Sequence, residues 1–330
     1  MHSVPLPPSR SGLSGLSAPA SPVGSWLAAL PLARLAAVSL PLVFILLWST
    51  GYAVGKLALP HTGPFTLLVL RFGLAAGVLL LVSLATRAPW PTRAAEWMHL
   101  AVVGLLMQAL HFSGVYYGLR LGLSAGVVAL IIGLMPLATA LGAHVWLAER
   151  VGRWQWAGLA GGLAGVALVV AGQHAGVAGP GAGAAPAWVA YAATVLGLSG
   201  LVLGTLYQKR FCAGMDLRSG SCVQMAVATA VVALLAGHFE GFAVHWSGEL
   251  VFATLWLGVV NSIGAFSLLF VMVRRGQAGQ VASLFYLIPG VSAGLGFVLL
   301  DERLSLLALA GFVLSAVAVC ACVGRKTGRV

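Results

Sequence analysis

Long apolar stretches of about 20 residues alternate with short polar or Gly- and Pro-containing segments along most of the chain. A transmembrane helix needs about 20 consecutive apolar residues, whereas a transmembrane β-strand shows about ten residues of alternating polarity. The first pattern is present and the second is absent, so the sequence predicts an all-α membrane protein with ten transmembrane helices. The predicted spans are approximately 37–59, 64–85, 97–118, 122–147, 154–172, 187–208, 218–236, 250–272, 277–300 and 304–323.

The segments outside these spans predict the domain organisation. Residues 1–35 are rich in Ser, Pro, Gly and Ala, which is typical of a disordered tail. Residues 173–186 are uncharged and rich in Gly, Ala and Pro, which predicts a flexible linker. The linker separates two five-span segments, 36–172 and 187–323, and residues 324–330 form a second tail.

The two segments are repeats of each other at a constant offset of 153 residues. The matching motifs are Ala125-Gly126 with Ala278-Gly279, Pro136 with Pro289, and Glu149-Arg150 with Glu302-Arg303. Because five spans per repeat is an odd number, the second repeat must be inverted in the membrane relative to the first. A duplicated membrane chain of this kind is typical of a transporter.

Charge supports this membrane topology. The chain is 60% hydrophobic and only 8% charged, so lipid must solvate much of its surface. With a cytoplasmic N-terminus, most of the 18 basic residues lie inside, whereas Lys56, Arg120 and Arg303 lie outside and Arg71 lies within a span. This positive-inside pattern predicts a multi-pass inner-membrane protein with both termini cytoplasmic. It also explains the net charge of +11 without a nucleic-acid partner.

Short motifs in both halves carry a family resemblance. They are Leu47-Trp48-Ser49-Thr50-Gly51-Tyr52, Leu70-Arg71-Phe72, Met135-Pro136, Leu147-Ala148-Glu149-Arg150, Ala282-Ser283-Leu284-Phe285-Tyr286-Leu287-Ile288-Pro289 and Asp301-Glu302-Arg303. They resemble the EamA-like family of the drug/metabolite transporter superfamily. The resemblance implies two five-helix repeats around a central cavity and export of amino acids or other small metabolites.

The chain departs from two branches of that superfamily. Small multidrug exporters use a membrane-embedded glutamate, but every acidic residue here lies in a loop or at a span end. The sugar-phosphate branch uses several basic residues in its cavity, but here only Lys56 and Arg71 lie well within spans. Both departures argue against those substrate classes.

Polar groups at bilayer depth are costly and indicate functional sites. Gln108 and His111 lie one helical turn apart in the third span, and Gln108 has Asn261 as its repeat partner. Two midplane amides related by the repeat predict a binding site at the repeat interface. Alternatively, each amide only bonds a neighbouring helix. His111 is the mid-span group that titrates near neutral pH, so it is a proton carrier, a ligand contact or a packing histidine.

Two basic residues are candidate contacts for a charged group. Lys56 lies about one turn from the outer end of the first span, where its ammonium can also reach the interface. Arg71 lies seven residues into the second span and either holds a structural partner or contacts an anionic group.

Aromatic residues and prolines complete the candidate site. Trp48 and Tyr286 lie deep in their spans and are expected to form cavity walls. The aromatics nearer the span ends are typical of interfacial belts, and these are Tyr52, Tyr116, Tyr117 and Tyr207. Pro136 and Pro289 lie mid-helix at equivalent positions and are either hinges or static bends.

The sequence argues against an enzyme. The run Gly197-Leu198-Ser199-Gly200 fits an intramembrane serine protease motif, but no histidine lies within a later span to act as the base. We therefore expect a carrier of a small polar metabolite that works by alternating access, without catalytic residues, metal or cofactor. An uncoupled facilitator is the main alternative, followed by an intramembrane enzyme or a membrane scaffold. The chain is expected to be a monomer or a homodimer.

Overall fold

The computed structural model of the chain describes residues 23–147, 153–173, 186–265, 267–268, 287–302 and 305–324. The regular elements in these ranges are helices. One isolated antiparallel bridge pairs Thr62 with Val244. The helices are α1 (Val23–Ala58), α2 (Pro64–Ala85), α3 (Ala94–Val103), η1 (Gly104–Leu110), α4 (His111–Arg120), α5 (Ala125–Gly133), α6 (Met135–Leu147), α7 (Arg153–Gln173), α8 (Ala187–Phe211), α9 (Leu217–Phe239), α10 (Gly248–Leu255), η2 (Trp256–Ala265), α13 (Ile288–Leu300) and α14 (Leu306–Gly324).

The chain divides into two compact units, residues 1–39 and residues 40–330. In the first unit, residues from Val23 onward are helical and belong to α1. The helix therefore begins earlier than the sequence analysis expected, because residues 23–35 were assigned to a disordered tail. Their sequence contains Trp-Leu-Ala-Ala-Leu, which has high helix propensity. The rest of that tail lies outside the described residues.

The second unit is built from apolar helices. Five described helical stretches are long and apolar enough to cross a membrane: Pro64–Ala85, Ala94–Arg120, Ala187–Phe211, Leu217–Phe239 and Gly248–Ala265. Shorter apolar helices are Leu42–Ala58, Ala125–Thr139, Trp156–Val169, Ile288–Leu300 and Leu306–Ala318. The predicted all-α membrane class is confirmed, while the count of ten spans stays a prediction.

Two π-helical segments interrupt the α-helices at equivalent places in the two repeats. The stretch Ala94–Arg120 contains η1 in its middle, and η2 continues α10. Gln108 lies in η1 and its repeat partner Asn261 lies in η2. Single π-helical turns are rare and occur often at functional sites. The paired amides therefore lie on the parts of these helices where the regular α-helical register is broken.

The two prolines at equivalent repeat positions lie at the starts of helices. Leu134 separates α5 from α6, and Leu287 precedes α13. Pro136 and Pro289 then lie in the first turn of the helix that follows, where the missing N–H loses no helical hydrogen bond. Both predicted hinge residues therefore lie in the first turn of a described helix, and not in mid-helix as the sequence analysis expected.

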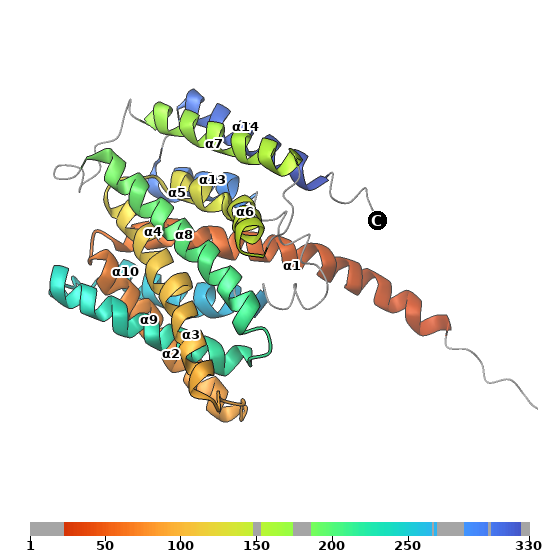
Figure 1. Cartoon of the computed structure of the whole chain (residues 1–330), viewed down its shortest axis with the longest axis vertical. Helices are drawn as coiled ribbons and strands as arrows, with labels where there is room; N and C mark the ends of the chain where they lie inside the picture. The colour runs from red at the N-terminus through yellow and green to blue at the C-terminus, as the bar shows by residue number, and fades with distance from the viewer. Residues whose placement is uncertain are drawn as a thin grey trace, which may run out of the picture. The chain divides into compact units, whose positions relative to one another are not determined.

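Helices that are repeat partners of each other pack together. Figure 1 shows α7 beside α14, where Ser315 donates a hydrogen bond to the carbonyl of its own repeat partner Gly162. Near this contact, a Cβ on Gly161 would meet Ala318, and one on Gly165 would meet the Gly311 carbonyl oxygen. From one of these contacts to the next, the residue numbers rise along α7 and fall along α14, so the two helices run antiparallel.

The same holds for α2 and α9, which are also repeat partners. Cys222 contacts the Ala76 carbonyl, and Ser219, one turn earlier in α9, bonds the Pro89 carbonyl beyond the end of α2. A Cβ on Gly73 would lie near Thr229. These contacts again run in opposite directions along the two helices.

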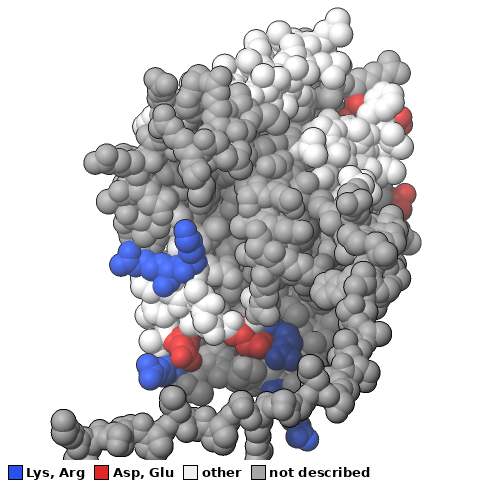
Figure 2. Space-filling view, turned by 90° about the vertical axis from the view of Figure 1, so that its right-hand side faces the viewer, with Lys and Arg blue, Asp and Glu red and all other residues white. Residues whose placement is uncertain are grey.

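Charged residues of the second unit lie mostly at helix ends. Those in terminal turns include Lys56, Glu96, Arg120, Lys209, Arg210 and Glu249. On the face shown in Figure 2, basic and acidic side chains lie close to one another in the lower half. Among the described residues of this unit, Arg71 is the exception, because it lies within α2 and is completely buried.

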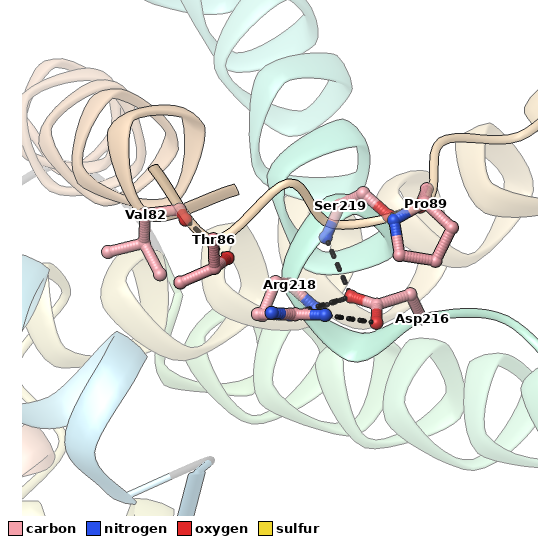
Figure 3. A network of polar contacts seen from close by, with 6 residues as sticks. All are labelled: Val82, Thr86, Pro89, Asp216, Arg218 and Ser219. Atoms are coloured by element: carbon pink, nitrogen blue, oxygen red, sulfur yellow. Dashed lines mark hydrogen bonds and ion pairs between the residues drawn. The ribbon is translucent and has the colours of Figure 1, made fainter. Parts of the chain in front are cut away.

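The N-terminus of α9 is held by a charged cap, which Figure 3 shows from close by. Asp216 Oδ1 accepts hydrogen bonds from the backbone N–H groups of Arg218 and Ser219, at 2.9 and 3.4 Å. The Arg218 guanidinium also donates to both oxygens of Asp216. Hydrogen bonding from the Arg218 side chain and from the two N–H groups holds the pKa of the Asp216 carboxyl below its ordinary value near 3.8.

Asp216→Ala is expected to lower the free energy of unfolding by about 1 kcal/mol, because it removes the cap. Since the carboxyl pKa is depressed on folding, this stabilisation is present above the ordinary aspartate pKa and is lost as pH falls through the folded value. Thermal unfolding in detergent from neutral to strongly acidic pH measures both effects. Asp216→Asn is the control, because it keeps a capping oxygen and does not titrate. The prediction is contradicted if the difference in melting temperature between the wild type and Asp216→Asn stays constant with pH.

Candidate functional site

A buried arginine joins three helical elements in the apolar interior. Arg71 of α2 donates from Nε to Ser262 Oγ at 2.9 Å and from Nη2 to Asn261 Oδ1 at 3.2 Å, and both partners lie on η2. Its Nη1 donates to Tyr116 Oη on α4 at 2.6 Å. The guanidinium carbon lies 4.0 Å from the centre of the Phe112 ring, close enough for a cation–π contact. We call Arg71, Phe112, Tyr116, Asn261 and Ser262 the arginine cluster.

All the hydrogen-bond partners of Arg71 in the described part of the chain are neutral. No hydrogen bond or ion pair joins its guanidinium to a carboxylate there. The described carboxylates that accept hydrogen bonds do so elsewhere, and they are Glu96, Asp216, Glu240, Glu249 and Glu302. A completely buried cation without a counter-charge is costly, so the arginine cluster is the strongest candidate for a functional site.

A small cavity lies against the arginine cluster. Its volume is about 10 Å³, enough for about one water molecule. The lining residues are Trp48, Gly51, Tyr52, His111, Phe112, Val115, Tyr116 and Asn261. Three residues that the sequence analysis proposed as binding contacts therefore meet in one wall, namely Trp48, His111 and Asn261.

Asn261 both lines the cavity and bonds neighbouring helices. Its Nδ2 donates to the Leu47 carbonyl of α1 at 2.6 Å while its Oδ1 accepts from Arg71. A Cβ on Gly51 would lie 2.9 Å from Asn261 Nδ2, so a glycine is needed there for the amide to reach α1. The sequence analysis gave lining of a cavity and bonding of a neighbouring helix as alternatives. The Asn261 side chain does both.

His111 is almost completely buried and bonds α8. Its Nδ1 lies 3.0 Å from the Gly197 carbonyl oxygen. A carbonyl only accepts, so Nδ1 carries the proton and Nε2 is the acceptor of the neutral ring. The ring also meets Phe112 edge-on, with centroids 4.5 Å apart. His111 is thus packed and oriented, and it still lies in the cavity wall.

Of the two remaining proposed contacts, Gln108 is not among the described residues that line the cavity. Gln108 is buried in η1, and its Oε1 has no hydrogen-bond partner among the described residues. Although Gln108 and Asn261 are repeat partners, only Asn261 lines the cavity. Tyr286 lies outside the described residues.

Comparisons with known proteins identify the family of the chain. The EamA-like transporter family matches residues 35–171 and 186–323, which is most of the chain. The chain belongs to the EamA-like transporter family. The resemblance carried by the motifs around Trp48 and Arg71 is therefore confirmed.

Individual relatives of this EamA-like transporter are distant. An uncharacterized transporter of Bacillus subtilis, YvbV, is 27% identical over 288 residues, covering 84% of this chain and 88% of the relative. A probable amino-acid metabolite efflux pump of Salmonella typhimurium is 26% identical over 289 residues, covering 83% and 90%. One solved crystal structure is similar to this chain with a TM-score of 0.61 and 22% sequence identity. The match covers 89% of this chain and 99% of the chain in that structure, which shows a shared fold.

The EamA-like chain places Lys56 away from the arginine cluster. Its ammonium pairs with Glu302 and donates to the Leu123 carbonyl at 2.9 Å. Both carboxylate oxygens of Glu302 also accept the N–H of Ala125, the first residue of α5. Residues of the first repeat are thus joined to a glutamate of the second. Lys56 thus has an ion-pair partner, and 25% and 11% of the Lys56 and Glu302 side chains are exposed.

Glu302→Gln is expected to lower the free energy of unfolding by about 1–3 kcal/mol, because hydrogen bonds to a charged group are lost. Thermal unfolding of the purified transporter in detergent measures the change. Glu249→Gln is the matched control, since the Glu249 side chain is 60% exposed and pairs only with His61 among the described residues. We expect a change below about 1 kcal/mol there. Equal shifts for both variants contradict the prediction.

Sequence reasoning missed several residues of the site of this EamA-like transporter. Tyr52 and Tyr116 were expected in interfacial belts, which is wrong, because both are buried and line the cavity. Ser262 and Phe112 were not singled out. A useful signal was present, since Phe112 and Tyr116 are four residues apart and share a helix face.

Proposed function

We propose that this EamA-like transporter carries a small polar metabolite of the amino-acid class outward across the inner membrane. The observation that carries this proposal is the buried arginine cluster beside a small cavity lined by residues that include Trp48, His111 and Asn261. Ligand pockets for small molecules are usually 300–1,000 Å³. A cavity of about 10 Å³ therefore has to widen before a metabolite enters, as alternating access requires.

The proposed topology is ten spans in two inverted repeats, with both termini cytoplasmic. The antiparallel packing of α7 with α14, and of α2 with α9, supports the inversion, because each pair consists of repeat partners. The outward direction and the amino-acid class are supported by the Salmonella relative, whose name describes an amino-acid metabolite efflux pump.

We propose that the helix breaks allow the movement. Pro136 and Pro289 lie in the first turns of α6 and α13, and the π-helical segments η1 and η2 lie at equivalent positions of the two repeats. Each is a place where a helix bends with few backbone hydrogen bonds to lose. Whether transport is coupled to protons or runs as an uncoupled facilitator depends on a group that titrates at the site, and His111 is the candidate.

Transport into and out of proteoliposomes tests the proposed function. Purified protein is reconstituted with a panel of labelled amino acids, and flux is measured with and without a pH gradient. We expect flux of at least one amino acid above that of empty liposomes. A pH gradient accelerates this flux if transport is proton-coupled and leaves it unchanged if the protein is a facilitator. The absence of flux for the whole panel overturns the proposed substrate class.

His111→Gln is expected to reduce the pH dependence of transport, because glutamine keeps hydrogen-bonding atoms but does not titrate. The measurement is the flux ratio between acidic and neutral pH for the variant and the wild type. His238→Gln is the control, since His238 lies in the last turn of α9 and is exposed. Unchanged pH dependence in His111→Gln removes His111 as the proton carrier and leaves it as a packing or ligand contact.

A further inference from the structure

Arg71 contributes a positive charge that the described part of the chain does not neutralise. The arginine is completely buried and its three hydrogen-bond acceptors are uncharged. The nearby rings belong to Phe72, Phe112 and Tyr116. We infer that Arg71 is the receptor for a carboxylate of the substrate, which takes the place of Asn261 Oδ1 on the guanidinium. This inference rests on the proposed function and deepens it, because it names the chemical group that the site recognises.

The geometry of the three bonds indicates which partner is exchanged. A guanidinium has five N–H donors, and three are used by described residues. The bond to Asn261 is the longest, at 3.2 Å, compared with 2.6 and 2.9 Å for Tyr116 and Ser262. Asn261 and Tyr116 both line the cavity, and of these two acceptors Asn261 has the longer bond to Arg71. A carboxylate that enters the cavity therefore reaches the guanidinium by displacing this amide oxygen.

Charge favours a carboxylate over a neutral group. Hydrogen bonds between ionised partners are roughly twice as strong as those between neutral ones, and arginine binds carboxylates with two parallel bonds. A single guanidinium matches the single charge of a carboxylate, whereas a phosphate monoester carries nearly two charges. Arg71 is the sole basic residue in the described part of the arginine cluster and cavity wall.

The remaining wall suits the other end of an amino acid. The neutral His111 ring has an acceptor at Nε2, because Nδ1 donates to the Gly197 carbonyl. Trp48, Tyr52 and Phe112 add aromatic faces, which attract ammonium groups. A zwitterion therefore finds acceptors for its ammonium in the cavity wall. It finds a cation for its carboxylate in Arg71, which is bonded to the wall residues Tyr116 and Asn261.

Displacement of Asn261 Oδ1 has a structural consequence. The same amide holds α1 through the Leu47 carbonyl, while its oxygen holds α2 through Arg71. Once a carboxylate replaces that oxygen, η2 loses this bond to α2 and keeps its bond to α1. Substrate binding thus loosens one contact between the two repeats, which is the step that alternating access needs.

Acids and their amides test the inference on the wild-type protein. Leucine, phenylalanine and threonine are each compared with their carboxamides in proteoliposome flux and in thermal stabilisation of the purified protein. We expect at least one acid to be carried, and to stabilise the protein, at more than tenfold lower concentration than its amide. Equal behaviour of acid and amide overturns the inference and leaves the proposed function standing. No flux and no stabilisation for all three pairs overturns both.

An internal carboxylate gives the second test. Asn261→Asp has the same size as the native side chain and places a negative charge beside Arg71, where it competes with the substrate. Asn261→Leu is the matched control, because it loses the same bond to Leu47 without adding charge. We expect Asn261→Asp to carry the preferred acid at least tenfold more slowly than Asn261→Leu, with both variants folded by thermal unfolding. Equal acid flux in the two variants overturns the inference.

Discussion

Arg71→Gln is expected to lower the flux of a carboxylate substrate by about 30-fold or more at concentrations well below saturation. Loss of one partner of a buried, hydrogen-bonded charge pair costs about 2–5 kcal/mol, and 1.4 kcal/mol corresponds to a factor of ten. The effect should appear mainly as a raised KM, because the charge binds the substrate. Flux measured over a range of substrate concentrations in proteoliposomes checks the prediction.

The variant also separates binding from stability. Glutamine does not reach all three acceptors, so Tyr116 and Ser262 each lose a charged donor and the melting temperature should fall. Arg71→Lys keeps the charge without the planar guanidinium. Its KM should therefore lie between those of the wild type and Arg71→Gln. Arg87→Gln is the control, because Arg87 is exposed and lies outside the helices. Arg71→Gln with wild-type KM and wild-type preference for acids contradicts a binding role.

Gly114→Ala is expected to have the largest effect on stability. A Cβ at Gly114 would lie 2.3 Å from the Ala193 carbonyl oxygen and 2.8 Å from the Gly197 nitrogen. Both are backbone atoms of α8, so the clash is relieved only if α4 and α8 move apart. Overpacking a tight contact costs about 1–3 kcal/mol or more. The melting temperature in detergent should fall clearly.

The change should also reach the candidate site. The Gly197 carbonyl of α8 accepts the hydrogen bond from His111 Nδ1 of α4, and α4 also carries Tyr116. Separation of α4 from α8 therefore stretches one side of the cavity wall, and transport should decline together with stability. Gly77→Ala is the matched control, since no atom lies within 4 Å of the Cβ it would add. We expect a neutral or slightly stabilising effect there, because alanine favours helix. Equal melting temperatures for the two variants contradict the prediction.

Much of the fold was predictable because the signal is local. Each span is recognised from the hydrophobicity of about 20 consecutive residues, so α2 at Pro64–Ala85 coincides with its predicted span. The start of α1 was misjudged, because helix formation at Val23 depends on propensity and not on membrane-spanning length. The π-helical segments were not predicted, since a π turn leaves no pattern in the sequence.

The candidate site was predictable only in part. The cost of polar groups at bilayer depth picked out His111 and Asn261, and the deep position of its ring picked out Trp48. The structure places all three in one cavity wall. The repeat offset also favoured Gln108, but its side chain does not line the cavity. The repeat shows that two residues have equivalent positions in the sequence. It does not show which of their side chains lines the cavity.

The sequence by itself determined the membrane class, the duplication and the family, because each depends on composition, spacing or motifs along the chain. The tertiary structure alone decided that Arg71 meets Tyr116, 45 residues away, and Asn261, 190 residues away. Such contacts depend on how each helix is rotated and how closely glycines such as Gly51 let a neighbour approach. Hydrophobic spacing leaves both undefined, since lipid-facing and core-facing positions of a transmembrane helix are equally apolar.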